Sequence, residues 1–423
     1  MTVSTALDHR IGAAAVRLTD ATGTALADAA VEVEQVRHAF GFGNIGFDLI
    51  DLAADGAAPG ASAFAGASQT RPELLADLWL DVFNHATLPF YWRQFEPTPG
   101  APDTARLQAA ARWFHARGVT VKGHPLLWHT LAPQWLMGLG DAAVEARIRE
   151  RIVRETRDFA GLVDMWDAIN EAVILPVFTA EDNAVTRLAH SRGQVEMVRL
   201  AFESAREGDP SVRLVLNDFD LSPDYEDLIE RCLDAGIAID AIGLQTHMHQ
   251  GFRGEDELHG ILERFARFGL PLQLTETTLV SGELMPAHIV DLNDYQVDHW
   301  PSIPEGEARQ ADELERHYRL AFSHPAVESL TYWGLTDDGA WLGAPAGLVR
   351  LDGTPKPAYD MLRALVRDQW WTAPTTLRTD RDGVLQLEGF AGEYRIGLAT
   401  QPARSATVTL DRGGTARLSA VLE

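Results

Sequence analysis

Apolar runs long enough for buried strands alternate with amphipathic stretches along most of this chain. The strand-like runs cover residues 40–46, 82–90, 119–128, 163–170, 212–218, 239–246, 271–276 and 328–334. Between them, apolar residues recur at helical spacing in stretches such as 104–117, 142–160, 194–207, 224–235, 255–268 and 307–323. Eight strands that alternate with helices predict an α/β fold with a parallel sheet, most economically a closed (β/α)8 TIM barrel. A doubly wound open sheet is the alternative, but polar signatures follow nearly every strand instead of meeting at one crevice.

The two ends of the chain show a different pattern, with short strand-like runs and many turn residues. Two runs cover 13–18 and 31–37, and five more follow Pro374, at 375–378, 384–388, 393–398, 407–410 and 416–421. Neither end alone makes a convincing core. We therefore predict that residues 1–38 and 373–423 form one small accessory β-sandwich, beside a barrel of residues 39–372. A structural cap is the favoured role for this module, and carbohydrate binding is the alternative.

Composition narrows the class of partner. The chain has 423 residues and can bury a large core. No apolar run of about eighteen residues suggests a membrane span. The formal net charge of −25 argues against nucleic acids and anionic membranes as partners, but it does not oppose a neutral sugar. Nothing in the sequence indicates an oligomeric state.

Three further features invite interpretation. Lys122 and Lys356 are the only lysines among the 36 Lys and Arg residues, which we interpret as genome bias rather than function. The single cysteine, Cys232, lies in a helix-like segment and cannot form an internal disulfide, so we expect a buried packing thiol. The amino terminus lacks a basic start followed by an apolar core, so no signal peptide is predicted. A cytoplasmic location is then the default, unless a leader was removed.

Two of the apolar runs end in glutamate. Residues 166–171 read Trp-Asp-Ala-Ile-Asn-Glu, and residues 272–276 read Leu-Gln-Leu-Thr-Glu. Hydrolysis of a glycosidic bond needs such a pair, because one carboxyl must protonate the departing oxygen while the other attacks or stabilises the anomeric carbon. A salt-bridged strand end is the structural alternative for either glutamate alone. The two together favour catalysis, since an unpaired buried charge is costly.

An ordered set of motifs, each at a strand end, resembles glycoside hydrolase family 10, the family of retaining β-1,4-xylanases and their relatives. The motifs are Gly123-His124-Pro125-Leu126-Leu127-Trp128-His129, residues 166–171, Asn217-Asp218, Gly243-Leu244-Gln245-Thr246-His247, Thr275-Glu276, Trp333-Gly334-Leu335-Thr336-Asp337 and Asp352-Gly353-Thr354-Pro355-Lys356-Pro357-Ala358-Tyr359. The match covers roughly residues 40–367. Each motif is weak alone, but the ordered set is specific.

The resemblance implies roles for the residues at the centre of the site. Glu171 would be the acid/base and Glu276 the nucleophile, and the pKa of Glu171 would have to be raised for the first step. Asn170 would hydrogen-bond the 2-hydroxyl of the sugar in the −1 subsite. Gln245 and His247 would point toward the nucleophile, and His247 would hold its carboxylate.

Around that sugar, the resemblance implies hydrogen bonds and stacking surfaces from four further side chains, His124, Trp128, Trp333 and Trp341. Three histidines could also suggest a metal site, at positions 247, 249 and 259. No carboxylate lies at a matching helical spacing, and retaining chemistry needs no metal. We therefore expect neither a metal nor a cofactor.

The chain departs from the family pattern on the non-reducing side of the cleaved bond. The Glu-Asn-x-x-Lys cluster that holds the −2 sugar in typical xylanases is replaced by residues 87–92, where Tyr91 is the candidate for sugar contact. Leu131 takes the place of a glutamine, Thr278 that of the aspartate behind the histidine–nucleophile contact, and Ala340 that of a serine. Loss of several hydrogen bonds, at ~1 kcal/mol each, should weaken a −2 subsite of the xylan type.

Two long insertions are expected on the active-site face. Residues 48–71 are rich in Ala, Gly and Pro, and residues 281–309 carry Trp300. Loops of this length in a barrel usually act as lids or substrate walls, so Trp300 is a candidate for substrate contact. A flexible surface insertion is the alternative, above all for the first loop.

The sequence thus predicts an enzyme that hydrolyses β-glycosidic bonds with retention, with endo-β-1,4-xylanase as the first hypothesis. The partner would be a carbohydrate or glycoside, with no nucleic acid or membrane involved. The alternative enzyme is a β-glycosidase or diglycosidase that acts on short oligosaccharides or plant aglycone glycosides. A cytoplasmic location would favour this alternative, since a polymer cannot enter the cell. A non-catalytic carbohydrate-binding relative is the competing class.

Overall fold

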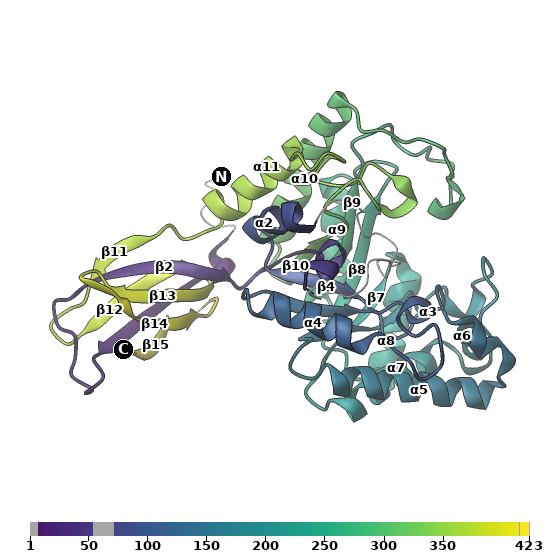
Figure 1. Cartoon of the computed structure of the whole chain (residues 1–423), viewed down its shortest axis with the longest axis horizontal. Helices are drawn as coiled ribbons and strands as arrows, with labels where there is room; N and C mark the ends of the chain where they lie inside the picture. Colours follow the sequence, from purple (N-terminus) through teal and green to yellow (C-terminus); the bar gives the residue numbers. More distant parts are fainter. Residues whose placement is uncertain (1–6, 54–71, 414, 423) are drawn as a thin grey trace. The chain divides into compact units, whose positions relative to one another are not determined.

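The computed structural model describes residues 7–53, 72–413 and 415–422 of the chain (Figure 1). The chain divides into two compact units. One consists of Phe42–Asp360, and the other joins the segment up to Gly41 with the segment from Met361 onward. The predicted domain limits at residues 38 and 373 stay predictions.

The first unit is built on a closed barrel of eight parallel strands, in the order β10-β3-β4-β5-β6-β7-β8-β9. The barrel strands are β3 (Gly41–Ile45), β4 (His85–Pro89), β5 (Thr120–His124), β6 (Met165–Asn170), β7 (Arg213–Asp218), β8 (Ala241–Met248), β9 (Leu272–Leu279) and β10 (Val327–Tyr332). Each lies within or next to one of the eight predicted apolar runs. The (β/α)8 prediction is therefore confirmed, and the open sheet is excluded.

Helices connect successive strands of the barrel, and one more helix, α11, follows the last barrel strand, β10 (Figure 1). Their bounds are α1 (Ile50–Ala53), α2 (Pro72–Val82), α3 (Trp92–Phe95), α4 (Thr104–His115), α5 (Asp141–Asp158), α6 (Ala184–Arg192), α7 (Gln194–Gly208), α8 (Pro223–Asp234), α9 (Glu255–Ala266), α10 (Pro304–Ser323) and α11 (Pro357–Ala364). Local sequence explains their starts. Helix α8, for example, begins with a proline in its first turn, and the Ser222 side chain before it accepts from the Asp224 N–H. Such caps satisfy backbone groups that a helix end leaves open.

The second unit is a β-sandwich made from both ends of the chain. One sheet has the order β12-β1-β15 and the other β11-β2-β13-β14. The strands are β1 (Ile11–Thr19), β2 (Ala30–His38), β11 (Thr375–Arg378), β12 (Val384–Phe390), β13 (Gly392–Leu398), β14 (Gln401–Leu410) and β15 (Thr415–Val421). Because β1 pairs with β12 and β15, and β2 with β11 and β13, neither end forms its sheet alone.

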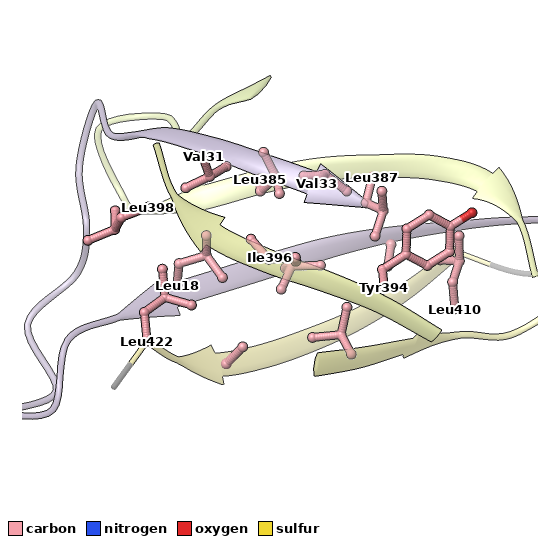
Figure 2. Packing of buried hydrophobic residues seen from close by; sticks show 14 residues of the cluster. Leu18, Val31, Val33, Leu385, Leu387, Tyr394, Ile396, Leu398, Leu410 and Leu422 are labelled. Carbon is pink, nitrogen blue, oxygen red and sulfur yellow. The ribbon is translucent and has the colours of Figure 1, made fainter. Parts of the chain in front are cut away.

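The sandwich has its own apolar core, which Figure 2 shows. Alternate residues of β1, at positions 14, 16 and 18, are buried while their neighbours are more exposed, as a half-buried strand requires. Val33, Leu387, Tyr394 and Ile396 pack into the same cluster. The Tyr394 hydroxyl donates to the Phe390 carbonyl oxygen at 2.6 Å, which satisfies the polar end of a buried ring. The prediction that the two ends build one β-sandwich is confirmed.

Several smaller predictions also meet the structure. Cys232 is fully buried on α8, as expected, and burial raises the pKa of its thiol to about 11. Over the described ranges, no helix is both long and apolar enough to cross a bilayer. Most of the first insertion, residues 54–71, lies outside the described part. The second insertion joins β9 to α10 and packs with Leu342, Ala344 and Ala346, which follow β10, in a small apolar cluster.

Candidate active site

The two glutamates stand at the carboxyl ends of β6 and β9. Glu171 directly follows Asn170, the last residue of β6, and Glu276 lies within β9. The carboxyl ends of parallel barrel strands meet at one face, which is where active sites of such barrels are built. Glu171 has φ +58°, a left-handed conformation that side chains other than glycine seldom adopt. Strain of this kind is found mainly where function requires it.

The carboxyl of Glu171 receives four nitrogen contacts. Trp128 Nε1 donates to Oε2 at 2.8 Å, and His129 Nε2 lies 3.6 Å from the same oxygen. Asn170 Nδ2 and Gln245 Nε2 donate to Oε1 at 3.2 and 3.4 Å. Burial raises the pKa of Glu171 to about 8, and the negative charges of Glu276 and Asp218 add to this effect, while the Trp128 and Gln245 bonds oppose it. A carboxyl with this pKa holds a proton near neutral pH and can give it away.

Glu276 lies among hydrogen-bond donors. Asn217 Nδ2 donates to Oε1 at 3.0 Å, and His247 Nε2 lies 3.2 Å from Oε2. His124 Nε2 is 4.0 Å from Oε1, and the Glu276 side chain is 7% exposed. Donors on both oxygens fix the orientation of the carboxylate, which a nucleophile needs. The structure thus gives the two glutamates different surroundings, as two different roles require.

Asn217, the penultimate residue of β7, links the two glutamates. Its Nδ2 also donates to Asn170 Oδ1 at 2.7 Å, and its Oδ1 accepts from Thr275 Oγ1 at 2.5 Å. Gln245 Nε2 donates to the same Asn170 oxygen at 3.0 Å, so one network joins Asn170, Asn217 and both carboxyls. Asn217 belongs to one of the sequence motifs but is not among the predicted site residues. Its place at a strand end, one residue before Asp218, was the signal that could have found it.

His124 is held by Asp167, which forms a buried ion pair with Lys122. His124 Nδ1 lies 2.8 Å from Asp167 Oδ2, and Lys122 Nζ lies 2.6 Å from Asp167 Oδ1, with all three side chains 2% exposed. Although burial opposes it, the charge of Lys122 and the His124 bond hold the pKa of Asp167 below its usual value. Lys356 is likewise buried, with Nζ 2.6 Å from Asp337 Oδ1. The two lysines therefore occupy paired interior positions.

An apolar cluster, called the apolar wall below, lies beside the two glutamates. It consists of Ile45, Phe47 and Tyr91, with Trp128, Leu131 and Trp333 packed against them. The Tyr91 ring lies 5.7 Å from the rings of both His124 and Trp128, and the Trp333 ring lies 5.2 Å from that of His124. Burial and the charges of Glu276 and Glu171 raise the pKa of Tyr91 well above its usual value. The predicted residues Tyr91, Trp128 and Trp333 are thus brought together near the glutamates, although their contact with sugar stays a prediction.

Trp341 and Trp300 have different surroundings. The Trp341 ring is partly exposed and lies 5.0 Å from the ring of His247, which contacts Glu276. Trp300 is 8% exposed, packs with Val280 and Met285 in the β9–α10 loop, and donates from Nε1 to the Glu283 carbonyl oxygen at 2.8 Å. The cluster around Trp300 also includes Ala344 and Ala346 from the segment after β10, and the Trp300 ring lies 6.2 Å from that of His249. Its contact with substrate stays a prediction.

No group of three or more His, Cys, Asp or Glu side chains within the described ranges could hold a metal ion. The arrangement on hand is a parallel barrel whose strand ends present two differently supported glutamates, together with aromatic rings and amide side chains. This combination defines the TIM-barrel glycoside hydrolases as the class. The sequence model of Glycosyl hydrolase family 10 matches residues 76–365, and the chain belongs to that family.

Known proteins similar to this chain include a xylanase sequence and a xylanase structure. An endo-1,4-beta-xylanase of Geobacillus stearothermophilus is 27% identical over 237 residues, which cover 52% of this chain and 68% of the relative. The crystal structure of xylanase 10B from Thermotoga petrophila RKU-1 in complex with xylobiose superposes with a TM-score of 0.63 at 21% identity, covering 78% of this chain and 95% of the other. This structural likeness shows the fold.

A third relative is similar along nearly the whole chain. The anti-sigma-I factor RsgI6 of Acetivibrio thermocellus is 25% identical over 409 residues, which cover 94% of this chain but 46% of that protein. The chain thus spans about half the length of this relative. Because residues 42–360 make up less than 94% of the chain, this similarity extends into the segments that build the sandwich.

Proposed function

We propose that this chain hydrolyses β-1,4-xylosidic bonds in xylan or xylo-oligosaccharides by double displacement, with retention at the anomeric carbon. One observation carries the proposal: Glu171, with a pKa of about 8, and Glu276, with donors on both oxygens, are joined through Asn217. Membership in family 10 and the similarity to endo-1,4-beta-xylanases support the choice of bond and sugar.

In the first step, Glu276 attacks the anomeric carbon while the protonated carboxyl of Glu171 gives its proton to the departing oxygen. The proton is available because burial keeps the pKa of Glu171 near 8. Trp128 Nε1 then stabilises the carboxylate that remains, since it already donates to Oε2 at 2.8 Å. The product of this step is a glycosyl ester on Glu276.

In the second step, Glu171 acts as a base toward water. Formation of the ester removes the negative charge of Glu276, and that charge is one of the causes that raise the pKa of Glu171. The loss therefore favours ionisation of Glu171 at the moment when a base is needed. Asn170 is held on both sides by Asn217 and Gln245, which suits it to orient a sugar hydroxyl in the −1 subsite.

The apolar wall favours a second candidate function. The resemblance implies that Tyr91 and Leu131 stand where typical members of the family hold a −2 sugar with polar groups, and both belong to the apolar cluster that contains Phe47. A surface of this kind can contact an apolar part of a substrate but offers a polysaccharide few hydrogen bonds. The second candidate is therefore a β-glycosidase or diglycosidase for short oligosaccharides or plant aglycone glycosides.

A non-catalytic role in carbohydrate binding is the third possibility, and the similarity to an anti-sigma factor keeps it in view. Both glutamates and their supporting network argue against it, because a binding protein has no need for a carboxyl whose pKa is about 8. For the accessory sandwich, we propose a structural role as a cap, and carbohydrate binding is the alternative.

The test is a parallel assay on polymeric xylan, xylo-oligosaccharides, and aryl and plant β-glycosides, with product identification and the anomer of the first product read by NMR. Release of short oligomers with a β-anomer supports the xylanase proposal. Cleavage confined to small glycosides selects the second candidate. No turnover, together with retained binding of xylo-oligosaccharides by calorimetry, would overturn both enzymatic functions. Glu276→Ala is the control for contaminating activity.

A further inference from the structure

The histidine that contacts the nucleophile is itself held by a threonine hydroxyl. Thr278 lies two residues beyond Glu276 on β9, and its Oγ1 lies 3.2 Å from Nδ1 of His247. The other nitrogen of that ring, Nε2, lies 3.2 Å from Oε2 of Glu276. Thr278 is 2% exposed, and the backbone N–H of Met248 donates to its Oγ1 at 3.4 Å. The hydroxyl is therefore one link away from the carboxylate.

A second histidine approaches the same hydroxyl. His249 is 1% exposed, and its Nδ1 lies 3.5 Å from Thr278 Oγ1. Burial, together with His247, lowers the pKa of His249 to about 3, so its ring is neutral and carries one N–H. Its Nε2 has no hydrogen-bond partner among the described residues. Because a buried N–H without an acceptor is costly, the proton belongs on Nδ1, where it can face the hydroxyl.

The donors and acceptors in this series of hydrogen bonds are all satisfied when every hydrogen bond points toward Glu276. The carboxylate of Glu276 is an acceptor, so His247 must present N–H at Nε2. A neutral imidazole then has a lone pair at Nδ1, and the Thr278 hydroxyl is the donor within reach. The hydroxyl oxygen keeps its lone pairs for the N–H groups of Met248 and His249. The order is His249 to Thr278 to His247 to Glu276.

Resting on the function proposed above, we propose that Thr278 is a positioning residue, whose hydroxyl donates to Nδ1 of His247 and so directs the Nε2–H of that ring at the nucleophile. A carboxylate at position 278 would instead accept from Nδ1 and favour a doubly protonated, cationic His247 beside Glu276. With a hydroxyl, the support consists of one hydrogen bond and no added charge. The same N–H can serve the glycosyl ester, since its oxygens are also acceptors.

Aromatic rings pack around the two histidines, although the His247 side chain stays 11% exposed. The Trp341 ring lies 5.0 Å from the ring of His247 and 5.2 Å from that of His249, and the Trp333 ring lies 6.3 Å from that of His247. Partial burial lowers the local dielectric, which strengthens the hydrogen bonds between Thr278, His247 and Glu276.

The first test is nitrogen-15 NMR of the histidine rings in the full-length protein at neutral pH, with His247→Gln used to assign the His247 signals. The expected result is the neutral Nε2–H tautomer for His247 in the wild type and protonation of both nitrogens in Thr278→Asp. A cationic or Nδ1–H ring in the wild type would overturn the inference. This measurement needs no turnover, so it remains decisive even if the proposed function fails.

The second test compares three variants on an activated aryl β-glycoside. Thr278→Val removes the hydroxyl at constant size and should lower kcat by about 10-fold with little change in KM, whereas Thr278→Ser should stay within about 3-fold of the wild type. Thr277→Val is the matched control. Its hydroxyl is also buried on β9, but it contacts Thr246 Oγ1 at 2.7 Å and His317 Nε2 at 3.5 Å. Equal kinetic losses in the two valine variants would mean a merely structural effect and would contradict the proposal.

Discussion

Two regions at the carboxyl ends of the barrel strands differ in chemical character, since one is polar and hydrogen-bonded and the other is apolar. Around Glu171 and Glu276, amide, imidazole and indole groups form hydrogen bonds that connect β6, β7, β8 and β9. Around Tyr91 and Phe47, at the ends of β4 and β3, the side chains form an apolar cluster. In the first region, directional hydrogen bonds hold the side-chain atoms at defined distances. In the second region, the side chains can make only non-directional apolar contacts.

From this difference we expect the polar region to carry the reaction and the apolar wall to determine which substrate is bound. A reacting carboxyl must be held in one orientation with a tuned pKa, and only a network of satisfied polar groups achieves this. A substrate surface can change from polar to apolar without altering that network. The polar region should therefore be intolerant of change, while substitutions in the apolar wall should alter which substrate is used.

The largest effect is expected from Glu276→Ala. Loss of the nucleophile removes the covalent route, so retaining turnover should fall by at least about 10⁴-fold on every substrate. The measurement is kcat/KM on an activated aryl β-glycoside, with circular dichroism to show that the variant is folded. Retained turnover with a β-configured first product would show that another group attacks the anomeric carbon.

Glu171→Ala should have the second largest effect, and the effect should depend on the substrate. Substrates with poor leaving groups should lose about 10²–10⁴-fold, because they need the proton, whereas substrates with good leaving groups should still form the ester. Azide should rescue the second step and give a β-azide product. Wild-type kcat/KM should fall as pH rises past about 8, where Glu171 loses its proton, and this decline should be absent in the variant. An unchanged pH profile would contradict the acid/base assignment.

The third prediction concerns the free energy of unfolding, because burial of the Glu171 carboxyl destabilises the folded protein at pH values where the carboxyl of the unfolded chain is ionised. Folding raises the pKa of Glu171 from 4.5 to about 8, so between these values the folded state holds a proton that the unfolded chain has released. Stability therefore falls as pH rises through this window and stays low above it. Glu171→Gln should gain little stability over the wild type near pH 4.5 and on the order of a few kcal/mol at pH 9.

Denaturant unfolding of the wild type and Glu171→Gln at both pH values measures this difference. Glu257→Gln, on the exposed side of α9 with its side chain 57% exposed, is the control for loss of one carboxyl. A pH-independent difference between Glu171→Gln and the wild type would contradict the burial of Glu171 as the cause.

The sequence located the barrel strands and the paired glutamates, because apolar period and strand-end position are local signals. The resemblance indicated His247 as a partner of Glu276, but the other partners of the two glutamates and of His124 were not predicted. Asn217 bridges two strands that neighbour each other only in the closed barrel, and Lys122 pairs with Asp167 across β5 and β6. Trp300 packs into an apolar cluster that its aromatic type alone does not indicate, and its contact with substrate stays a prediction. Contacts of this kind depend on three-dimensional packing rather than on pattern.

The smallest effect is expected in the apolar wall, from Leu131→Gln. Leu131 is partly buried in the wall, and its carbonyl oxygen accepts from the Arg93 N–H at 2.8 Å, so the backbone stays anchored when the side chain changes. An added amide can hydrogen-bond a second sugar, and one such bond at ~1 kcal/mol corresponds to about a 5-fold gain. The ratio of kcat/KM on xylobiosides to that on aryl monoglycosides should rise by this factor. Leu131→Met, of similar volume but without the amide, should leave the ratio unchanged. If Leu131→Gln and Leu131→Met gave the same ratio, the polarity of the apolar wall would not determine substrate choice. The two regions would then differ in polarity without differing in role.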